Sequence, residues 1–131
     1  MATKLVIDAA MDAALNYLKG KESSPGLTLC VCAGDPANRA AALTSGANGL
    51  AQVALDTGGA DLTGPADDTS GRKLDVAEQA DISVTNSGTA DNVCIVDDTN
   101  IIVRTTCSDT VLSDTGTVTV QTWKWNIQDA T

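Results

Sequence analysis

The most informative stretch of the sequence is Gly116-Thr117-Val118-Thr119-Val120-Gln121-Thr122-Trp123-Lys124-Trp125-Asn126-Ile127. It alternates apolar and polar residues, which is typical of a half-buried strand. The apolar positions change phase once, from Val118 and Val120 to Trp123, Trp125 and Ile127. A strand cannot change face without an extra residue, so we expect a bulge or sharp bend near Gln121-Thr122. A strand of this kind can serve two sheets, or one sheet and a partner.

The second half of this strand carries both tryptophans of the chain. The sequence has no phenylalanine, and Tyr17 is its single tyrosine. We therefore expect Trp123 and Trp125 either to anchor the core or to anchor a subunit interface. If they are buried, replacing one of them by alanine is expected to cost roughly 3–5 kcal/mol.

Length and charge limit the possible functions. The chain has 131 residues, which suits one domain spanning residues 1–131, and its formal net charge is −9 with no histidine. Nucleic acid and anionic membranes both favour clustered Lys and Arg, so neither is an expected partner. The apolar content consists mainly of Ala, Val, Leu and Ile beside many Gly, Thr, Asp and Ser residues, a mixture that favours short strands joined by tight turns.

One amphipathic helix is predicted over residues 5–19. Its apolar face is formed by Ile7, Met11, Leu15 and Leu18 at spacings of four, four and three. Asp8 suits the positive end of the helix dipole, and Gly20 is expected to end the helix as its C′ residue. An alanine-rich flank would allow the close approach of a sheet or of another subunit.

About seven strands are predicted between about residues 27 and 128. Residues 27–33 are apolar on both faces and are expected to form a central strand. The clearest hairpin joins residues 92–96 to residues 100–105 through Asp97-Asp98-Thr99. Residues 58–71 and 107–115 are interpreted as polar loops, and residues 37–49 as a short helix or irregular loop. The predicted fold class is mainly β: an antiparallel β-sandwich or partly open barrel with one N-terminal helix.

The cysteines are expected to be structural. Cys30 and Cys32 share a strand face, and Cys94 lies in an apolar run, so small buried side chains are the favoured interpretation, with a Cys94–Cys107 disulfide as the alternative. Without histidine, His-based catalysis and His-ligated metals are excluded, and no phosphate-binding loop is present. Most aspartates lie in turns, where they stabilise the backbone. We expect no enzyme activity, no cofactor and no metal.

We do not expect the N-terminal residues to form a signal peptide, because Asp8 and Asp12 interrupt the apolar run and no cleavage pattern follows. No apolar run approaches the roughly 20 residues that span a bilayer. The protein is expected to be made in the cytoplasm with reduced thiols.

The order of several motifs resembles a family of small structural proteins from the virions of tailed bacteriophages. The motifs are Asp8-Ala9-Ala10-Met11-Asp12-Ala13-Ala14-Leu15, the Cys30 strand ending at Asp35-Pro36, Asp68-Thr69-Ser70-Gly71-Arg72-Lys73, Ser83-Val84-Thr85-Asn86-Ser87-Gly88-Thr89-Ala90, Thr105-Thr106-Cys107, Val118-Thr119-Val120-Gln121-Thr122-Trp123 and Ile127-Gln128-Asp129-Ala130-Thr131. The resemblance covers nearly the whole chain. It is closest in kind to head decoration, or cement, proteins.

The resemblance implies a location on the capsid surface of the virion and synthesis in the host bacterium. It implies binding to the major capsid protein, bridging of neighbouring shell subunits and formation of a homo-oligomer, such as a trimer. It supplies no catalytic residues. Two alternatives stay open: a structural component of the neck, tail or a head fibre, and a glycan- or receptor-binding module displayed on the virion.

Overall fold

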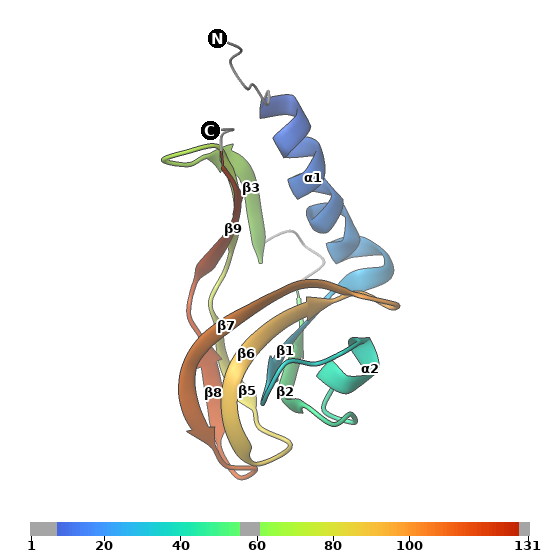
Figure 1. The fold of residues 1–131 in the computed structure, drawn as a ribbon, viewed down its shortest axis with the longest axis vertical. Coiled ribbons are helices and arrows are strands. Elements are labelled where there is room, and N and C mark those ends of the chain that lie inside the picture. The colour runs from blue at the N-terminus through green and yellow to red at the C-terminus, as the bar shows by residue number, and fades with distance from the viewer. Residues whose placement is uncertain (1–7, 56–60, 129–131) are drawn as a thin grey trace.

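The computed structural model describes residues 8–55 and 61–128 and is mainly β, with an N-terminal helix (Figure 1). This confirms the predicted fold class, although the described residues form nine strands rather than about seven. The elements are α1 (Asp8–Lys21), the π-helical turn η1 (Glu22–Gly26), β1 (Thr28–Cys32), α2 (Arg39–Ala42), β2 (Gly49–Ala54), β3 (Leu62–Asp67), β4 (Arg72–Val76), β5 (Gln79–Ser83), β6 (Gly88–Val96), β7 (Ile101–Leu112), β8 (Thr117–Val120) and β9 (Trp123–Ile127).

The largest sheet has four antiparallel strands in the order β2-β1-β6-β7. The central position predicted for the first strand is confirmed, because β1 pairs with both β2 and β6. Its two faces bury different groups: Leu29 and Val31 face the main core, and Cys30 and Cys32 face a smaller cluster beside α2. The predicted β6–β7 hairpin is also confirmed, and Asp97 closes its turn by accepting from the backbone N–H groups of Thr99 and Asn100.

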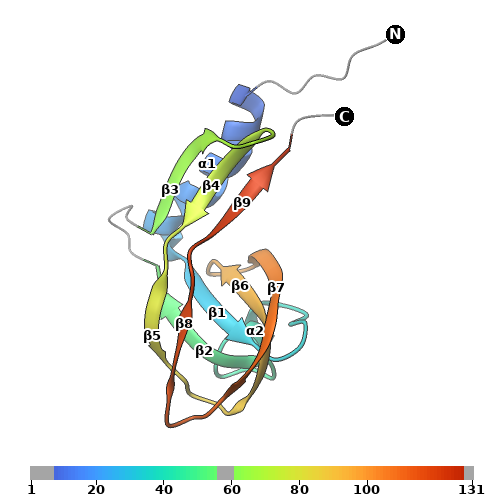
Figure 2. The same ribbon diagram turned by 90° about the vertical axis from the view of Figure 1, so that its left-hand side faces the viewer.

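Two long segments of the chain, β4 to β5 and β8 to β9, run side by side along the molecule (Figure 2). In the upper half, β4 pairs with β3 and β9, and in the lower half β5 pairs with β8. The chain passes from β8 to β9 at Gln121-Thr122, where the phase change was predicted. The sequence thus correctly indicated one strand that serves two sheets.

The lower half is a partly open barrel. A single bridge between Ala51 of β2 and Val84 joins the four-stranded sheet to the segment after β5, and the N–H groups of Thr85 and Asn86 donate to the Leu50 carbonyl. At the other side, β7 and β8 are not hydrogen-bonded neighbours. The barrel therefore stays open between these two strands.

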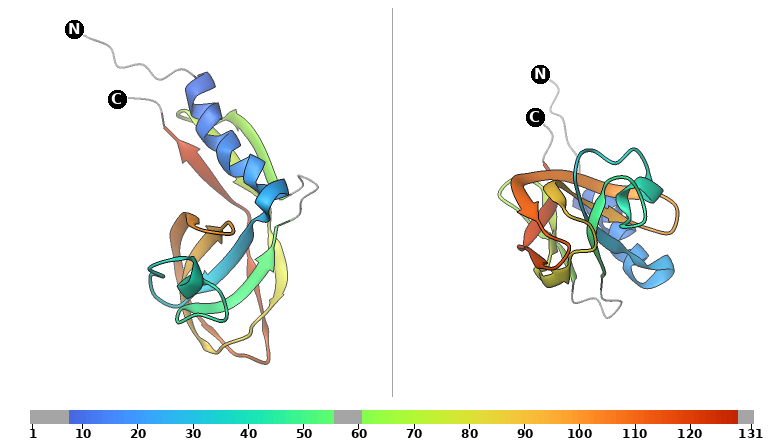
Figure 3. Two further views of the ribbon diagram at one scale, coloured as in Figure 1. Left: turned by 90° about the vertical axis from the view of Figure 1, so that its right-hand side faces the viewer. Right: turned by 90° about the horizontal axis from the view of Figure 1, so that it is seen from below.

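Helix α1 covers the β3-β4-β9 sheet in the upper half (Figure 3). Met11, Leu15 and Leu18 are buried as predicted, and Leu15 and Leu18 belong to the same core cluster as the barrel residues. Ile7, the fourth residue of the predicted face, lies outside the described residues.

The predicted end of the helix at Gly20 is wrong. The helix continues to Lys21, and the π-helical turn ends at Gly26, which has the positive φ of 100° expected of a terminating glycine. Tertiary contacts stabilise the extra turn: Lys19 Nζ donates to the Gly64 carbonyl at 2.9 Å, and Lys21 Nζ lies 3.4 Å from Asp97 Oδ2.

Two predicted loops contain strands. Residues 62–67 form β3, whose pairing with β4 is interrupted between Thr63 and Ala66, and residues 107–112 complete the twelve-residue β7. Both segments lack clear alternation because they lie at sheet edges, where exposed residues on both faces carry no periodic signal.

Candidate interaction surface

The open side of the barrel forms a seam between β7 and β8 with a volume of about 470 Å³. Residues 113–116 connect the two strands, which then diverge from that turn (Figure 2). The floor of the seam is apolar and comes from Val31 of β1 and from Ala90 and Val93 of β6. The seam therefore reaches down to the barrel core, whose residues at this point stay buried, between two strands that do not pair with each other.

The walls of the seam carry almost no charge. One wall is lined by Thr105, Thr106, Cys107, Ser108 and Thr110 of β7, and the other by residues 118–124, of which only Lys124 is charged. The chain as a whole has a net charge of −9, so this neutral stretch differs from the rest of the sequence. Hydroxyl groups above an apolar floor suit a polypeptide better than an ion or a nucleic acid.

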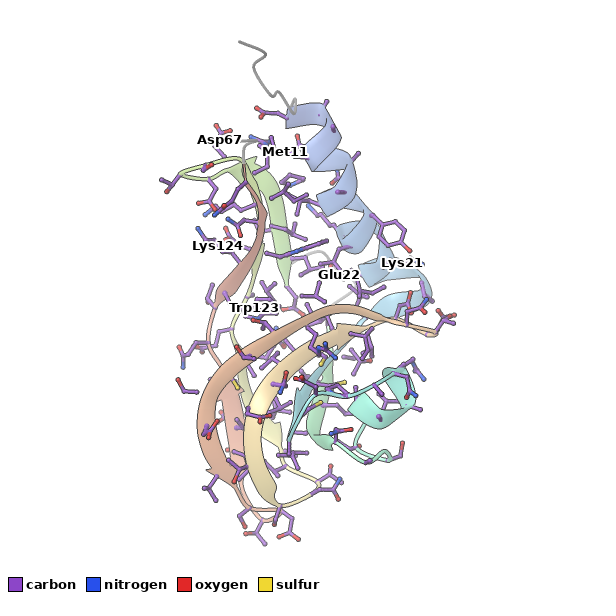
Figure 4. The ribbon with its side chains drawn as sticks, viewed as in Figure 1. Met11, Lys21, Glu22, Asp67, Trp123 and Lys124 are labelled. Atoms are coloured by element: carbon purple, nitrogen blue, oxygen red, sulfur yellow. The ribbon has the colours of Figure 1, made fainter. Side chains whose placement is uncertain are left out.

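Trp123 lines the seam, at the level where β9 meets the lower half (Figure 4). Its side chain is half-buried, and its Nε1 is buried without a hydrogen-bond partner among the described residues. Trp125 and Ile127 are half-buried on β9, opposite Leu74 and Arg72 of β4, and all three residues pack against the main core. The three predicted anchors of this strand thus pack together with the core, and only Trp123 also lines the seam.

The exposed edge of β7 is the feature that sequence reasoning missed. Residues 104–111 are exposed without interruption, and Val111 is 83% exposed. The interpretation of residues 107–115 as a loop concealed this edge. The available signal was the uncharged run at residues 105–108, which resembles an edge strand as much as a loop.

The alanine-rich flank of α1 is the second exposed apolar region. Ala9, Ala10, Ala13 and Ala14 are exposed, and Tyr17 is 58% exposed. Lys21 Nζ lies 5.2 Å from the centre of the Tyr17 ring, which is within the range of a cation–π contact. The flank predicted to face a sheet or another subunit does not face a sheet among the described residues.

Charged side chains join α1 and β9 to the tip of the β3–β4 hairpin. Arg72 donates from Nε and Nη2 to the two carboxylate oxygens of Asp12, at 2.7 and 3.2 Å, and also contacts Asp67. Lys124 Nζ donates to both oxygens of Asp68 at 2.8 Å, and this contact holds the pKa of the Asp68 carboxyl below its usual value. These pairs connect α1 and β9 to the hairpin in the upper half, and Lys124 also lines the seam.

The cysteines are all free thiols. Cys30, Cys32 and Cys94 are buried between β1 and β6, as predicted, whereas Cys107 is exposed on β7. Cys32 Sγ donates to the Ala42 carbonyl at 3.4 Å, and burial raises the pKa of Cys30 to about 12. The alternative of a Cys94–Cys107 disulfide is wrong, because one residue lies in the interior and the other faces solvent.

Within residues 8–55 and 61–128, no group of three or more His, Cys, Asp or Glu residues is placed to hold a metal ion. No helix in that part of the chain has the length and apolarity needed to span a membrane. Comparisons with protein families, with curated proteins and with solved structures found no match.

Proposed function

We propose that this protein is a structural protein of a bacteriophage virion that binds the outer surface of the capsid shell. The observation that carries the proposal is the seam, an open side of the barrel between β7 and β8, which do not pair with each other, above an apolar floor. A protein that stabilises a shell needs contact surface rather than a reactive site. The seam supplies such a surface on an otherwise acidic chain.

The proposed partner is the major capsid protein, and the proposed effect is to bridge neighbouring shell subunits. A bridging protein gains affinity when several copies bind at once, because the second contact is intramolecular. The proposal includes a symmetric homo-oligomer, expected from the resemblance as a trimer. The alternative that most resembles it is a neck, tail or head-fibre component, which differs in copy number and location.

The test combines a particle map with a binding measurement. A cryo-electron-microscopy map of the intact particle should show density of this size repeated over the shell surface. Density limited to one vertex or to the tail would refute shell binding and favour the alternative. Absence of such density would refute both.

Purified protein should also cosediment with shells that lack it. Thr122 is an exposed residue of the seam, and Thr122→Lys should weaken binding by placing a charge in the neutral wall. Thr63→Lys is the matched control, since Thr63 is an exposed threonine on β3. Equal binding of both variants would show that the seam does not contact the shell.

A further inference from the structure

Apart from the bulge at residues 107–109, the free edge of β7 lacks the features that keep edge strands from pairing with other chains. β7 has a hydrogen-bonded neighbour on one side only, which is β6, and it extends over twelve residues. Natural edge strands are usually short or interrupted by Lys or Pro. The centre of β7, Thr105-Thr106-Cys107-Ser108, has neither. An exposed edge of this length and composition suits pairing with another strand.

The sequence of β7 is complementary to itself when one copy is reversed. Five positions on one side of the midpoint read Ile102-Val103-Arg104-Thr105-Thr106, and five on the other read Val111-Thr110-Asp109-Ser108-Cys107. Apolar Ile102 corresponds to apolar Val111, and Thr105 corresponds to Ser108. The two charged residues, Arg104 and Asp109, have opposite signs and lie equally far from the midpoint.

A bulge places these two charges on the same face of the sheet. Val103 and Leu112 are both buried, although regular alternation over nine residues would put them on opposite faces. The pairing is interrupted between Thr106, which pairs with Asn92, and Thr110, which pairs with Ala90, so three residues of β7 oppose one of β6. Arg104 pairs with Cys94 of the smaller cluster, and Asp109 adjoins Thr110, which pairs with Ala90 of the main core, so both charges point away from the main core.

We propose that two copies of this chain form a homodimer by pairing β7 with β7, antiparallel, about a two-fold axis between Thr106 and Cys107. Each Arg104 then lies opposite Asp109 of the second copy, and each Val111 lies opposite Ile102. A two-fold interface must be self-complementary in this way, because the same surface meets itself. The volume of the seam beside β7 leaves the edge accessible to the second copy.

Both charged groups are available for this contact. The Asp109 carboxylate is exposed and has no hydrogen bond or ion pair within the described part of the chain. Arg104 donates from Nη1 to the Pro36 carbonyl at 3.0 Å, and a guanidinium group has five N–H donors in all. Further donors of Arg104 can therefore bind a carboxylate of the second copy.

This inference does not rest on the proposed shell function. A two-fold dimer differs from the trimer expected from the resemblance. Pairing through β7 would cover the β7 wall of the seam, so shell binding by such a dimer would use the other wall, which includes Thr122. The two hypotheses therefore fail separately: sedimentation of the purified protein tests the dimer, and the particle map tests the function.

The test is sedimentation equilibrium of the full chain over a wide range of concentration. The wild type should associate to a dimer. Asp109→Arg places Arg opposite Arg twice and should lower the association constant by roughly 10- to 100-fold. Arg104→Asp should act similarly, and the double variant R104D/D109R should restore most of the association. Asp114→Arg is the matched control, because it makes the same charge change at an exposed aspartate outside β7.

Cysteine cross-linking gives a second readout that does not depend on charge. Cys107 is the one exposed thiol of the four and lies next to the proposed axis. A short bismaleimide should therefore link two wild-type copies, and the product should be absent from Cys107→Ser and reduced in Asp109→Arg. Circular dichroism confirms that each variant folds. A wild type that stays monomeric up to millimolar concentration would overturn the proposal, as would a dimer unaffected by Asp109→Arg.

Discussion

The indole of Trp123 provides a sharp test of the packing around the seam. Its Nε1 is buried and has no hydrogen-bond partner among the described residues, while the ring packs against the main core. A buried donor without a partner destabilises the folded state by about 1–3 kcal/mol. Trp123→Phe removes this donor and keeps most of the ring, whereas Trp123→Ala removes both.

The two substitutions should have very different effects. Full burial of a tryptophan would make its replacement by alanine cost roughly 3–5 kcal/mol, and half-burial of Trp123 reduces the expected loss to about 2 kcal/mol. For Trp123→Phe, the loss of ring contacts is about 1 kcal/mol and is offset by a similar gain from removing the unpaired donor. The phenylalanine variant should therefore unfold within about 1 kcal/mol of the wild type.

Urea unfolding followed by far-ultraviolet circular dichroism measures both free energies without relying on tryptophan fluorescence. In thermal unfolding, at about 4 °C per kcal/mol for a chain of this size, the two variants should differ in Tm by roughly 5–10 °C. Trp125→Phe is the control, because the Trp125 nitrogen is not among the buried atoms that lack a partner. If Trp123→Phe were as destabilising as Trp123→Ala, the indole N–H would have to make a stabilising hydrogen bond, and the argument would be refuted.

Three further predictions concern other parts of the molecule. In the native protein a thiol reagent at pH 8 should modify only Cys107, and it should modify no cysteine in Cys107→Ser. The reason is that Cys30, Cys32 and Cys94 are buried, and burial raises the pKa of Cys30 to about 12. Modification of more than one thiol without unfolding would contradict this. Hydrogen bonds from the N–H groups of Asn100 and Thr99 lower the pKa of Asp97, so the Asp97 carboxylate binds a proton less readily in the folded state than in the unfolded state. The stability that this carboxylate supplies is therefore present above about pH 4 and is lost as the pH falls through the lowered pKa. The wild type should exceed Asp97→Asn in unfolding free energy at pH 7 and approach it near pH 2, and an equal difference at both pH values would refute the assignment. Gly71→Ala should destabilise by about 2 kcal/mol or more in urea unfolding, because φ is +81° and a Cβ would clash with the Ile127 carbonyl oxygen. Gly20→Ala is the control and should be neutral or stabilising, because the space around Gly20 is open.

The strands that contribute to the core could be predicted from the sequence because burial imposes a pattern on them. β1 is apolar on both faces, and the phase change at Gln121-Thr122 marks the passage from the β5–β8 pair to the β4–β9 pair. The end of α1 could not be predicted, because Gly20 is a normal helix terminator. The helix continues past it owing to the contact of Lys21 with Asp97, a residue 76 positions away in the chain.

The candidate site was harder to predict than the core for a physical reason. The wall of the seam in β7 is exposed on both faces, so no period in hydrophobicity identifies it as a strand, and its bulge at residues 107–109 interrupts what alternation remains. Only its pairing with β6 shows that residues 107–112 are extended. The seam itself depends on the absence of hydrogen bonds between two strands that are consecutive in the chain, which no local pattern encodes.

The distribution of charge connects this edge to assembly. A chain with a net charge of −9 repels other copies at long range, which favours solubility before assembly. The uncharged centre of β7 and the neutral wall of β8 lack that local protection, and they border the open side of the barrel. Because an unprotected edge promotes aggregation, a soluble protein should retain one only where a specific contact covers it. The opposite charges of Arg104 and Asp109 would limit that contact to one register, since a shift of the second copy by a single residue would separate both pairs and reverse the faces that meet.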